Sequence, residues 1–335
     1  MTDRRPSFAV LGAGSWGTAL AMLLARNGFT VRLWGHLQDE VEQLRQDGEN
    51  RHYLPGIPFP PGIHPTADLG EALDSAIESL VVVPSHAFRS VLQAIAPLLP
   101  PDKGLSWATK GFEPDTHLLL HEVAREVLGE RDLAVMSGPT FAREVAEGLP
   151  TAITVAATSI GHATRLADCL HTETFRAYTS SDLIGVQVGG ATKNVMAIAA
   201  GIADGLGFGA NTRAALITRG LAEIMRLGRA MGAHTETFMG LAGIGDLALT
   251  CTDDQSRNRR MGLALARGLS VAEAREEIGQ EVEGVHTTAE VLALSREKGV
   301  VMPITEQTYK VLFEGLAPKA AVHALLERRQ KAELE

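Results

Sequence analysis

Runs of apolar residues alternate with amphipathic stretches along the first half of the chain. Short runs that are apolar almost throughout predict buried strands at 8–14, 30–35, 79–85, 104–111 and 133–139. The stretches 18–28 and 38–48 instead repeat their apolar positions with a helical period and end in glycine. Strands that alternate with helices and are apolar on both faces indicate a mostly parallel sheet with helices on both sides.

The pattern changes twice further along the chain. The stretch "YLPGIPFPPGI" at 53–63 predicts a loop, because proline neither donates a ladder hydrogen bond nor extends a helix. "TAITVAA" and "FRAYTSS" continue the strand pattern to about residue 181, and the positions after it follow a helical period. We therefore predict an α/β domain of the Rossmann type at 1–181 and an all-helical domain at 182–335.

Length and composition exclude several classes of protein. The 335 residues are too many for one small core, so two domains are expected. The net charge of −9 argues against a nucleic-acid binder, which needs a basic face. Two cysteines, Cys169 and Cys251, are too few for a disulfide framework or a cysteine-based metal site and are typical of a reducing compartment. We therefore predict a cytoplasmic protein.

An uncharged stretch at 6–25 follows Arg4 and Arg5 and superficially resembles a signal peptide. Glycines at a defined spacing interrupt it, however, and a folded strand, turn and helix account for them better. No other stretch approaches the ~20 apolar residues that a membrane span requires. The sequence thus predicts no membrane span.

The glycines of this stretch, Gly12, Gly14 and Gly17, match the pattern G-x-G-x-x-G. Such a pattern can simply mark a tight turn. Here it leaves a predicted strand and opens a predicted helix, as in dinucleotide-binding βαβ units. In those units the first glycine makes the turn, the second admits the pyrophosphate and the third lets helix and strand pack closely. The free N–H groups of the helix N-terminus then face the anion.

The end of the second predicted strand bears on the choice of cofactor. An NAD-specific site usually has an Asp or Glu there for the ribose 2′-hydroxyl. This chain has Trp34, Gly35 and His36, with Arg32 nearby and no acid. NADP, or dual use, is therefore favoured over strict NAD. His36 is our candidate near the 2′-phosphate, although it could simply begin a surface loop.

Two lysines lie where chemistry is expected. Ligands of an open α/β sheet bind beyond the carboxyl ends of its strands, where Lys110, Gly138 and Thr140 are predicted. Lys193 stands inside an apolar helix among small residues, although it could also reach solvent from the helix edge. Burial and a second cation would both disfavour its charged form and so lower the pKa of Lys193. A lysine with a lowered pKa can act as a general acid and base. Asp246 is a candidate partner for it.

Other polar clusters leave alternatives open. Residues 250–262, "TCTDDQSRNRRMG", concentrate three arginines in an acidic protein. They form either a solvated helix start or a site for a phosphate. His117 and His121 are spaced i, i+4, but no third ligand stands out, so we interpret them as a helix surface and predict no metal site.

Taken together, these segments resemble the bacterial-type NAD(P)-dependent glycerol-3-phosphate dehydrogenases, from about residue 8 to residue 315. The matching stretches are "VLGAGSWGTALA", "ATKG", "SGPTFA", "GATKNVMAIAAG", "GLAGIGDL", "SRNRRMG" and "EVEG". Two positions depart from the family pattern. Thr192 replaces an aliphatic residue beside the signature lysine, and Glu281 stands where a valine is frequent.

The resemblance implies a role for each matching residue. Lys193 is the catalytic residue. Cofactor contacts fall on Gly12, Gly14, Ser15, Trp16, Gly17, His36, Lys110, Ala142, Arg257 and Glu283. Substrate contacts fall on Lys110, Gly138, Thr140, Lys193, Asp246, Ser256, Arg257 and Asn258.

The resemblance also implies an activity. It is the interconversion of sn-glycerol 3-phosphate and dihydroxyacetone phosphate by hydride transfer with NADP or NAD, NADPH being favoured. This reaction supplies the glycerol backbone of phospholipids. Arg257 would bind the substrate phosphate with Ser256 and Asn258 as neutral donors. A homodimer is possible.

Three rival functions remain in view. Another dehydrogenase with a helical second domain, of the ketopantoate or hydroxyisobutyrate type, would bind a carboxylate and have no use for the basic stretch after residue 255. A non-catalytic NADP sensor would need neither Lys193 nor that stretch. A methyltransferase also has a glycine-rich cofactor loop, but phosphate-directed residues in its second domain would be unexplained.

Overall fold

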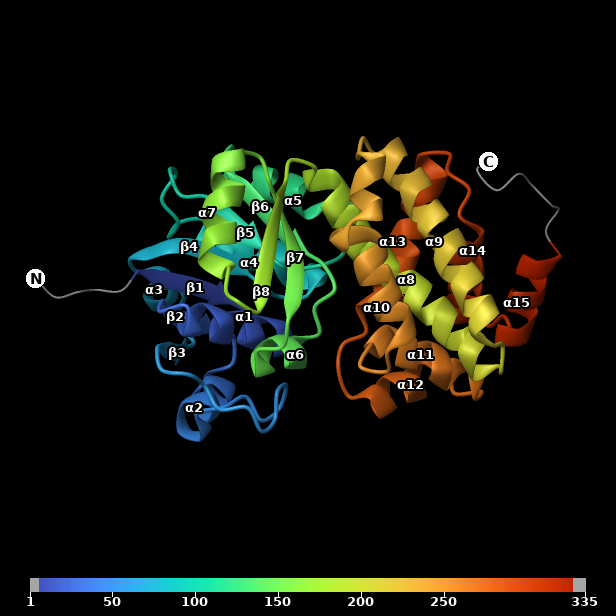
Figure 1. Ribbon diagram of the computed structural model, residues 1–335, viewed down its shortest axis with the longest axis horizontal. Helices are drawn as coiled ribbons and strands as arrows, with labels where there is room; N and C mark the ends of the chain where they lie inside the picture. Colours follow the sequence, from blue (N-terminus) through green and yellow to red (C-terminus); the bar gives the residue numbers. More distant parts are fainter. Residues whose placement is uncertain (1–5, 328–335) are drawn as a thin grey trace, which may run out of the picture. The chain divides into compact units, whose positions relative to one another are not determined.

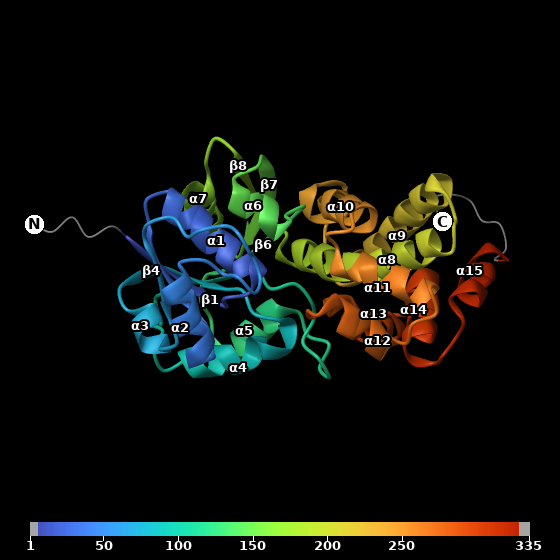
Figure 2. The ribbon, with the colours of Figure 1, turned by 90° about the horizontal axis from the view of Figure 1, so that it is seen from below.

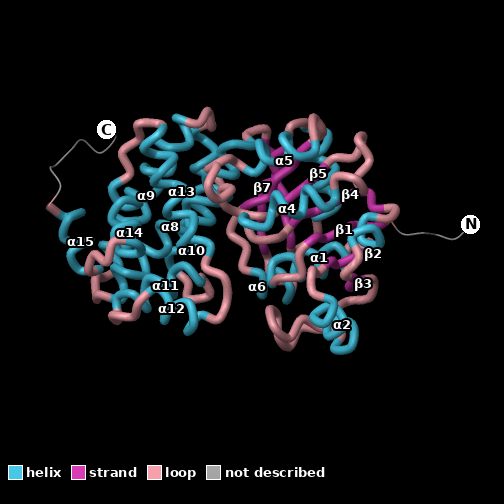
Figure 3. The backbone as a smooth tube through the Cα atoms, turned by 180° about the vertical axis from the view of Figure 1, so that it is seen from behind, coloured by secondary structure: helices cyan, strands magenta, loops and turns pink. Residues whose placement is uncertain are grey.

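The chain folds into two compact units that divide between Gln187 and Val188. The computed structural model describes residues 6–327. All described strands lie in the first unit, and the described part of the second unit is helical (Figures 1 and 3). The sequence predicted a boundary near residue 181, just after the last strand ends. The helix that follows, α8 (Leu183–Gly205), begins in the first unit and continues in the second.

The first unit is built on one eight-stranded sheet of order β3-β2-β1-β4-β5-β6-β7-β8. Neighbouring strands pair in parallel except β6 and β7, which are antiparallel. The strands are β1 (Ser7–Leu11), β2 (Thr30–Trp34), β3 (Ile63–Thr66), β4 (Ala76–Val81), β5 (Leu105–Trp107), β6 (Leu133–Ser137), β7 (Thr151–Ala157) and β8 (Phe175–Ser180). The order from β3 to β6 is that of the Rossmann fold, so the predicted fold class is confirmed.

Helices cover both faces of this sheet. Helices α1, α6 and α7 pack together on one face, and α4 and α5 pack together on the other (Figure 2). The helices of this unit are α1 (Ser15–Arg26), α2 (Gln38–Asp47), α3 (Leu69–Leu73), α4 (Ser85–Ile95), α5 (Leu120–Leu128), α6 (Ala142–Glu147) and α7 (Ile160–Leu170). Because both faces are covered, Phe8, Ala9, Val10 and Leu11 of the central strand β1 are all fully buried.

The strand β3 was not predicted. The stretch 53–63 was expected to be a loop, and the structure is irregular up to Gly62, but Ile63 then begins a strand that contains Pro65. A proline cannot donate a ladder hydrogen bond, so it is tolerated only where one side of the strand has no partner. β3 is such an edge strand, because it pairs with β2 alone.

The interpretation of two histidines as a helix surface is wrong. His117 precedes α5 and has a left-handed backbone, with φ of 59°, so it is not on the helix. His121 is on the helix but is buried, and burial lowers the pKa of its imidazole. The side-chain amide of Gln187 donates to Nδ1 of His121 at 3.1 Å. This contact joins α5 to the first turns of α8.

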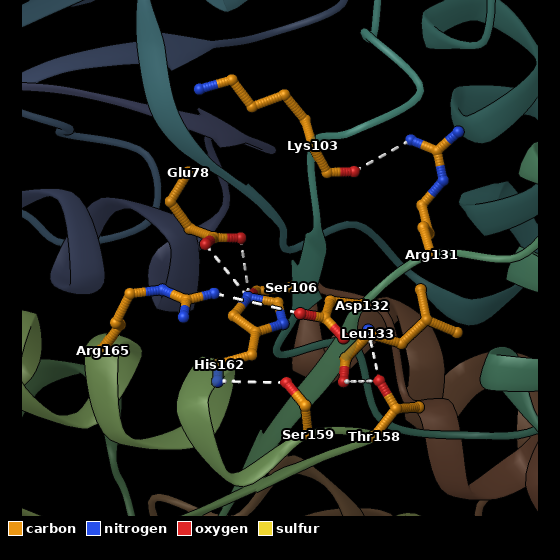
Figure 4. A network of polar contacts seen from close by, with 10 residues as sticks. All are labelled: Glu78, Lys103, Ser106, Arg131, Asp132, Leu133, Thr158, Ser159, His162 and Arg165. Carbon is orange, nitrogen blue, oxygen red and sulfur yellow. Dashed lines mark hydrogen bonds and ion pairs between the residues drawn. The ribbon is translucent and has the colours of Figure 1, made fainter.

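A buried polar network joins β4, β5 and α7 (Figure 4). The carboxylate of Glu78 accepts a hydrogen bond from Ser106 at 2.8 Å and lies 3.0 Å from Nε2 of His162. The imidazole is only 1% exposed, and a side chain at Gly104 would press against it. Gly104 in "KGLSW" therefore leaves room for the imidazole of His162, which links α7 to β4 and β5.

The second unit continues as helices from α8 onward. They are α9 (Ala210–Ala230), α10 (Asp246–Thr252), α11 (Arg257–Ala266), α12 (Val271–Ile278), α13 (Glu283–Glu297), α14 (Pro303–Phe313) and α15 (Pro318–Leu326), with the short turns η1 (Thr235–Met239) and η2 (Leu241–Gly245) between α9 and α10. Part of its core is formed by Ile198, Met261 and Val285, which come from α8, α11 and α13. Apolar side chains at helical spacing on each helix explain why these elements pack.

Helix α8 is long and apolar enough to cross a membrane, judged by length and composition alone. The expectation that no stretch after the N-terminus approaches such a length is therefore wrong for this helix. However, 94% of its most apolar 18-residue window is buried within the protein. Such burial is typical of a core helix, and no other described helix passes the same test.

Candidate active site

The glycine loop between β1 and α1 has the form that a dinucleotide requires. Gly12 has φ of 129°, and a side chain there would collide with the carbonyl of Val82. A side chain at Gly17 would collide with the carbonyl of Gly12, which lies one turn below it. Around Gly14 there is open space instead, since an added Cβ would meet no atom within 4 Å. Two glycines thus allow close packing, and the third leaves a space at the helix N-terminus.

Helix α1 begins at Ser15, three residues earlier than predicted. Its first turn contains Ser15, Trp16 and Gly17 and carries no acidic residue, so nothing there opposes an anion. The N–H groups of a first helical turn have no partners within the helix. These residues fit the pyrophosphate of a dinucleotide.

The end of β2 carries no acid, as predicted. His36 is exposed in the turn that leads to α2. Arg32 is less available than the sequence suggested, because its guanidinium pairs with Glu71 at 3.0 Å. Among the residues named for the 2′-phosphate, His36 is therefore the better placed, and its role stays a prediction.

The carboxyl ends of β4, β5 and β6 bring further predicted residues together. Thr109 donates to the carbonyl of Val83 at 2.7 Å, which joins the loops that follow β5 and β4. The ammonium of Lys110 lies 3.3 Å from the carbonyl oxygen of Gly138, after β6. Thr140 donates to the same carbonyl at 3.1 Å, and Ala142 begins α6 two residues later. Lys110, Gly138 and Thr140 thus share one edge of the sheet.

The loop that follows Lys110 is fixed by an ion pair that the sequence analysis did not find. The carboxylate of Glu113 accepts hydrogen bonds from Arg89 of α4 at 2.6 and 2.8 Å and from Thr116 at 2.6 Å. The hydrogen bonds from Arg89 hold the pKa of Glu113 below its ordinary value. The only sign of this ion pair in the sequence was a single acid three residues after Lys110, which is too common to single out.

Lys193 is a buried residue of α8. Its side chain is 10% exposed, and its ammonium donates to Oδ1 of Asp246 at 2.5 Å and to the hydroxyl of Thr250 at 2.9 Å. Thr250 in turn donates to the backbone carbonyl of Asp246 at 2.6 Å. The alternative of a lysine that reaches solvent from a helix edge is therefore wrong. The predicted contact with Asp246 is present, and Thr250 is an addition to it.

Small residues explain how α8 and α10 approach so closely. A side chain at Gly189 of α8 would collide with the carbonyl of Ala242 in the turn before α10. Gly243 in that turn has φ of −107° and ψ of −105°, which interrupts the helix and lets Asp246 begin a new one. Cys251 lies deeper in α10, where burial raises the pKa of its thiol to about 12. It is therefore a neutral packing residue beside the lysine.

The departure at Thr192 is also explained. Its side chain is fully buried, and its hydroxyl donates to the carbonyl of Val188 one turn earlier at 2.6 Å. A hydroxyl bonded in this way presents its methyl group to the core. The position therefore accepts threonine in place of an aliphatic residue without leaving a polar group unsatisfied.

The basic stretch starts helix α11. Ser256 is the N-cap, and its side chain accepts the N–H of Arg259 at 3.2 Å. Arg257 and Asn258 are the first two residues of the helix, and its first turn carries no acid. The sequence left open a solvated helix start or a phosphate site. The helix start is present, but it is not solvated, because Ser256, Asn258 and Arg259 are buried. A helix N-terminus is itself suited to an anion, so the phosphate site stays a prediction.

Asn258 also holds three helices together. Its amide nitrogen donates to the side chain of Asn194 on α8 at 2.9 Å, and its oxygen accepts the N–H of Gly284 on α13 at 2.9 Å. A side chain at Gly284 would press against that oxygen. At most one N–H of the side-chain amide of Asn258 is then left for a phosphate. Glu283, the predicted cofactor contact, is the first residue of the same helix α13.

The positive charge of this stretch is smaller than the sequence suggested. Arg259 is buried and pairs with Asp204 and, at 2.9 Å, with Asp254. Arg213 of α9 pairs with the same Asp204 at 2.8 Å. One of the three arginines thus has a structural role, and Arg257 and Arg260 remain as candidates for binding an anion.

Comparison with known proteins decides the family. Two family models match, the NAD-dependent glycerol-3-phosphate dehydrogenase N-terminus over residues 7–163 and the C-terminus of the same family over residues 182–323. The chain belongs to the NAD-dependent glycerol-3-phosphate dehydrogenase family. The predicted family is thereby confirmed.

Individual relatives agree with this assignment. The chain is 57% identical to the glycerol-3-phosphate dehydrogenase [NAD(P)+] of Methylococcus capsulatus, over 98% of this chain and 99% of the relative. It is 58% identical to the protein of the same name from Aeromonas hydrophila, over 98% of each. A crystal structure of glycerol-3-phosphate dehydrogenase from Coxiella burnetii superposes with a TM-score of 0.94 at 48% identity, covering 97% of this chain and 99% of that one.

The rival dehydrogenases share the fold at most. A ketopantoate reductase from Ralstonia eutropha is 17% identical and superposes with a TM-score of 0.59, covering 95% of this chain and all of that one. The family assignment also removes the sensor and the methyltransferase from consideration. A bound nicotinamide dinucleotide fits what the structure offers, since the open space at Gly14 lies at the start of an acid-free helix.

Proposed function

We propose that this glycerol-3-phosphate dehydrogenase family member interconverts sn-glycerol 3-phosphate and dihydroxyacetone phosphate. The observation that carries the proposal is the buried ammonium of Lys193, held at 2.5 Å by Asp246 and at 2.9 Å by Thr250. A rigidly held proton donor in an apolar helix is the group that ketone reduction needs. A buried charge is costly unless it is paired, and a paired lysine inside an apolar helix is a candidate for a role in the chemistry.

The glycine loop holds the cofactor. Gly12 and Gly17 shape the turn, and Gly14, Ser15 and Trp16 present the helix N-terminus to the pyrophosphate. His36 binds the 2′-phosphate of NADPH, which is favoured over NADH because no acid follows β2. Lys110, Ala142, Arg257 and Glu283 complete the cofactor contacts. When bound, the cofactor supplies the hydride that reaches C2 of the substrate.

Lys193 supplies the proton. Its ammonium donates to the oxygen on C2 as negative charge develops there, and it takes the proton back in the reverse direction. Asp246 and Thr250 fix the direction of the side chain and keep an otherwise buried charge paired. The three side chains thus act together, and of the three only the lysine contacts the reacting atoms.

The substrate phosphate binds at the start of α11. Arg257 can bind two phosphate oxygens with its planar guanidinium, and the N–H groups of the first turn add further donors. Ser256 and the remaining N–H of Asn258 contribute at the same end. Lys110, Gly138 and Thr140 contribute substrate contacts from the sheet edge. These assignments extend the family pattern to the positions of this chain.

The setting of the reaction is part of the same proposal. We propose that the enzyme is cytoplasmic, works as a homodimer and supplies the glycerol backbone for phospholipid synthesis. Neither nucleic acid nor a metal enters the reaction. Among the described residues, no group of three histidine, cysteine or acidic side chains could hold a metal ion.

The test is an assay of the purified protein. NADPH and NADH oxidation are each followed with dihydroxyacetone phosphate, dihydroxyacetone and ketopantoate. We expect turnover with dihydroxyacetone phosphate, at least as fast with NADPH as with NADH, and little with the other two substrates. Turnover of ketopantoate without turnover of dihydroxyacetone phosphate would overturn the proposal. Absence of turnover with all three substrates would also overturn it.

A further inference from the structure

Asn50 makes an unusual set of contacts with the glycine loop. It lies between α2 and the proline-rich stretch and is only 2% exposed. Its amide nitrogen donates to the carbonyl oxygen of Ala13 at 2.9 Å and to the hydroxyl of Thr18 at 2.8 Å. Its amide oxygen accepts the N–H of Tyr53 at 3.1 Å. One side chain thus connects the loop before β3 to both ends of the turn that opens α1.

The contact with Ala13 fixes a peptide group inside the glycine motif. Ala13 stands between Gly12 and Gly14, so its carbonyl belongs to the peptide bond that leads into Gly14. In a planar trans peptide the C=O and the following N–H point in opposite directions. Asn50 therefore holds the carbonyl of Ala13 toward itself and turns the N–H of Gly14 away from itself.

This peptide is free to flip unless something holds it. A flip would reverse φ of Gly14, which is −72°, to a positive value that glycine adopts at little cost. The open space around Gly14 would not prevent it. After the flip a carbonyl oxygen would take the place of the N–H, and a partial negative charge would face the side from which an anion approaches.

The other contacts of Asn50 have a simpler role. The N–H of Leu54 donates to the backbone carbonyl of Asn50 at 2.8 Å, which closes the turn at 50–54 whatever the side chain is. Only the two hydrogens of the side-chain amide reach the glycine loop. The contact with Tyr53 needs only an oxygen acceptor, which an aspartate would also supply, so it is the donors to the glycine loop that require an asparagine.

We propose that Asn50 is a positioning residue for the cofactor, which keeps the Ala13–Gly14 peptide in the orientation that binds the pyrophosphate. The inference rests on the proposed dinucleotide site at the glycine loop. It assigns the pyrophosphate, and neither the adenine nor the 2′-phosphate, as the group whose binding depends on Asn50. The hydrogen bond to Ala13 is the contact that carries this effect.

The experiment compares three ligands on Asn50→Ala by calorimetry. ADP-ribose and NADPH contain the pyrophosphate, whereas adenosine 2′-monophosphate lacks it. We expect ADP-ribose and NADPH to bind at least about tenfold more weakly than to the wild type, with the affinity for adenosine 2′-monophosphate unchanged. Equal losses for all three ligands, or no loss for any, would overturn the inference. Failure of the wild type to bind NADPH would instead contradict the proposed function.

Two further variants separate positioning from general stability. Thr18→Val removes one acceptor of the Asn50 amide and the longer hydrogen bond, at 3.5 Å, that the Thr18 hydroxyl donates to the carbonyl of Ala13. It leaves the 2.9 Å hydrogen bond from Asn50 to that carbonyl, so it should lower thermal stability with little change in ADP-ribose affinity. Asn27→Ala is the matched control, because Asn27 caps the other end of α1 and donates to the carbonyl of Cys169 at 2.8 Å. Loss of ADP-ribose affinity in either variant equal to that of Asn50→Ala would contradict the inference.

A second substitution covers a failure of Asn50→Ala to fold. Asn50→Asp is nearly isosteric and keeps an acceptor for Tyr53 and for the hydroxyl of Thr18, but it has no donor for Ala13. Its charge would also repel the pyrophosphate, and added salt screens that repulsion only weakly because position 50 is buried. Asn50→Leu, which is of similar size and uncharged, removes the donor without adding a charge. An ADP-ribose affinity of Asn50→Leu at least about tenfold weaker than that of the wild type supports the inference, and wild-type affinity overturns it.

Discussion

The ammonium of Lys193 lies 2.5 Å from Oδ1 of Asp246, and both groups are buried. The two residues come from different helices, and Asp246 is the first residue of α10. Removing water from both charges is costly, and the cost is offset only where geometry and hydrogen bonds are good. Thr250 supplies the additional hydrogen bonds here. The pair is therefore expected to serve both the stability of the second unit and the chemistry.

Asp246→Asn tests the double role of this pair. The variant removes the buried countercharge at 2.5 Å from the ammonium, so we expect a loss of about 3 kcal/mol in the free energy of unfolding. We also expect kcat to fall by at least about tenfold, because the proton donor is no longer oriented. Urea titration and steady-state kinetics measure the two effects.

The matched control is Asp254→Asn. Asp254 also pairs with a cation of the second unit, at 2.9 Å, but its side chain is 73% exposed. An exposed carboxylate contributes little to an ion pair, and the buried Arg259 keeps its second partner Asp204, so this variant should be nearly as stable and as active as the wild type. Equal effects of the two substitutions would show that the pair with Lys193 has no special part in catalysis.

The arginines of α11 are expected to differ in kinetics. Arg257→Ala should lower kcat/KM for dihydroxyacetone phosphate by about 1.5–3 kcal/mol in transition-state binding and abolish the preference over unphosphorylated dihydroxyacetone. Arg257→Lys should restore only part of the loss, because it keeps the charge without the planar fork.

Arg259→Ala and Arg260→Ala complete this series. Arg259 pairs with Asp204 and Asp254, so its loss should lower stability and leave the preference for the phosphorylated ketone intact. Arg260→Ala should be milder than Arg257→Ala in every respect. If all three variants keep the wild-type substrate preference, the start of α11 is not the phosphate site.

The glycines of the cofactor loop are expected to separate stability from binding. An added methyl group at Gly14 meets no atom within 4 Å, so Gly14→Ala should unfold at the wild-type temperature but bind NADPH more weakly, because it fills the space for the cofactor. Gly17→Ala would collide with the carbonyl of Gly12 and should lose both stability and binding. Differential scanning calorimetry and NADPH titration measure both. Undiminished NADPH binding by Gly14→Ala would place the pyrophosphate elsewhere.

Glu223 predicts a pH dependence of stability. Its carboxylate is buried at the start of α14, where it accepts the N–H groups of Ile304 at 2.7 Å and Thr305 at 3.2 Å. Burial outweighs these hydrogen bonds and raises the pKa of Glu223 from an ordinary 4.5 to about 7. Because the folded-state pKa is the higher one, the stabilising contribution is complete below pH 4.5 and is lost as the pH rises through about 7.

Comparison with Glu223→Gln isolates this contribution. The free energy of unfolding of the wild type, minus that of the variant, should fall by about 3 kcal/mol between these two pH values. Circular dichroism is the suitable probe, because the second unit is helical and the three tryptophans, Trp16, Trp34 and Trp107, all lie in the first. Glu273→Gln is the control of opposite sign, since hydrogen bonds from Ser270 lower the pKa of Glu273. A difference that stays constant with pH would contradict the prediction.

The sequence was sufficient for most of the fold, because burial on both faces leaves apolar runs that are easy to recognise. It was not sufficient for β3, whose proline is compatible with a strand only at an edge. An edge position is a property of the whole sheet and has no local signal. The left-handed backbone of His117, which removes it from the helix, is likewise set by the surrounding loop.

The residues of the candidate site could be predicted where they belong to a recognisable sequence motif. Lys193 and Asp246 were named from their stretches, and their contact is present. Asn50 was missed because a polar residue beside a proline-rich loop is ordinary, and its contact with Ala13 spans 37 positions of the chain. The pairing of Arg259 with Asp204 could not be predicted either, because the sequence shows where charged residues stand but not which of them pair in the fold.

The most direct test of the account is the kinetics of Lys193→Met with dihydroxyacetone phosphate and NADPH. The substitution keeps much of the apolar stem and removes the proton donor. We expect kcat to fall by about 10²–10⁴-fold while the Kd of NADPH stays within about threefold of the wild type. Lys298→Met, at a lysine of the same unit that pairs with the neighbouring Glu297 at 2.9 Å, is the control and should be fully active. A Lys193→Met enzyme that kept more than about a tenth of the wild-type kcat would show that Lys193 is a structural residue and would contradict the account.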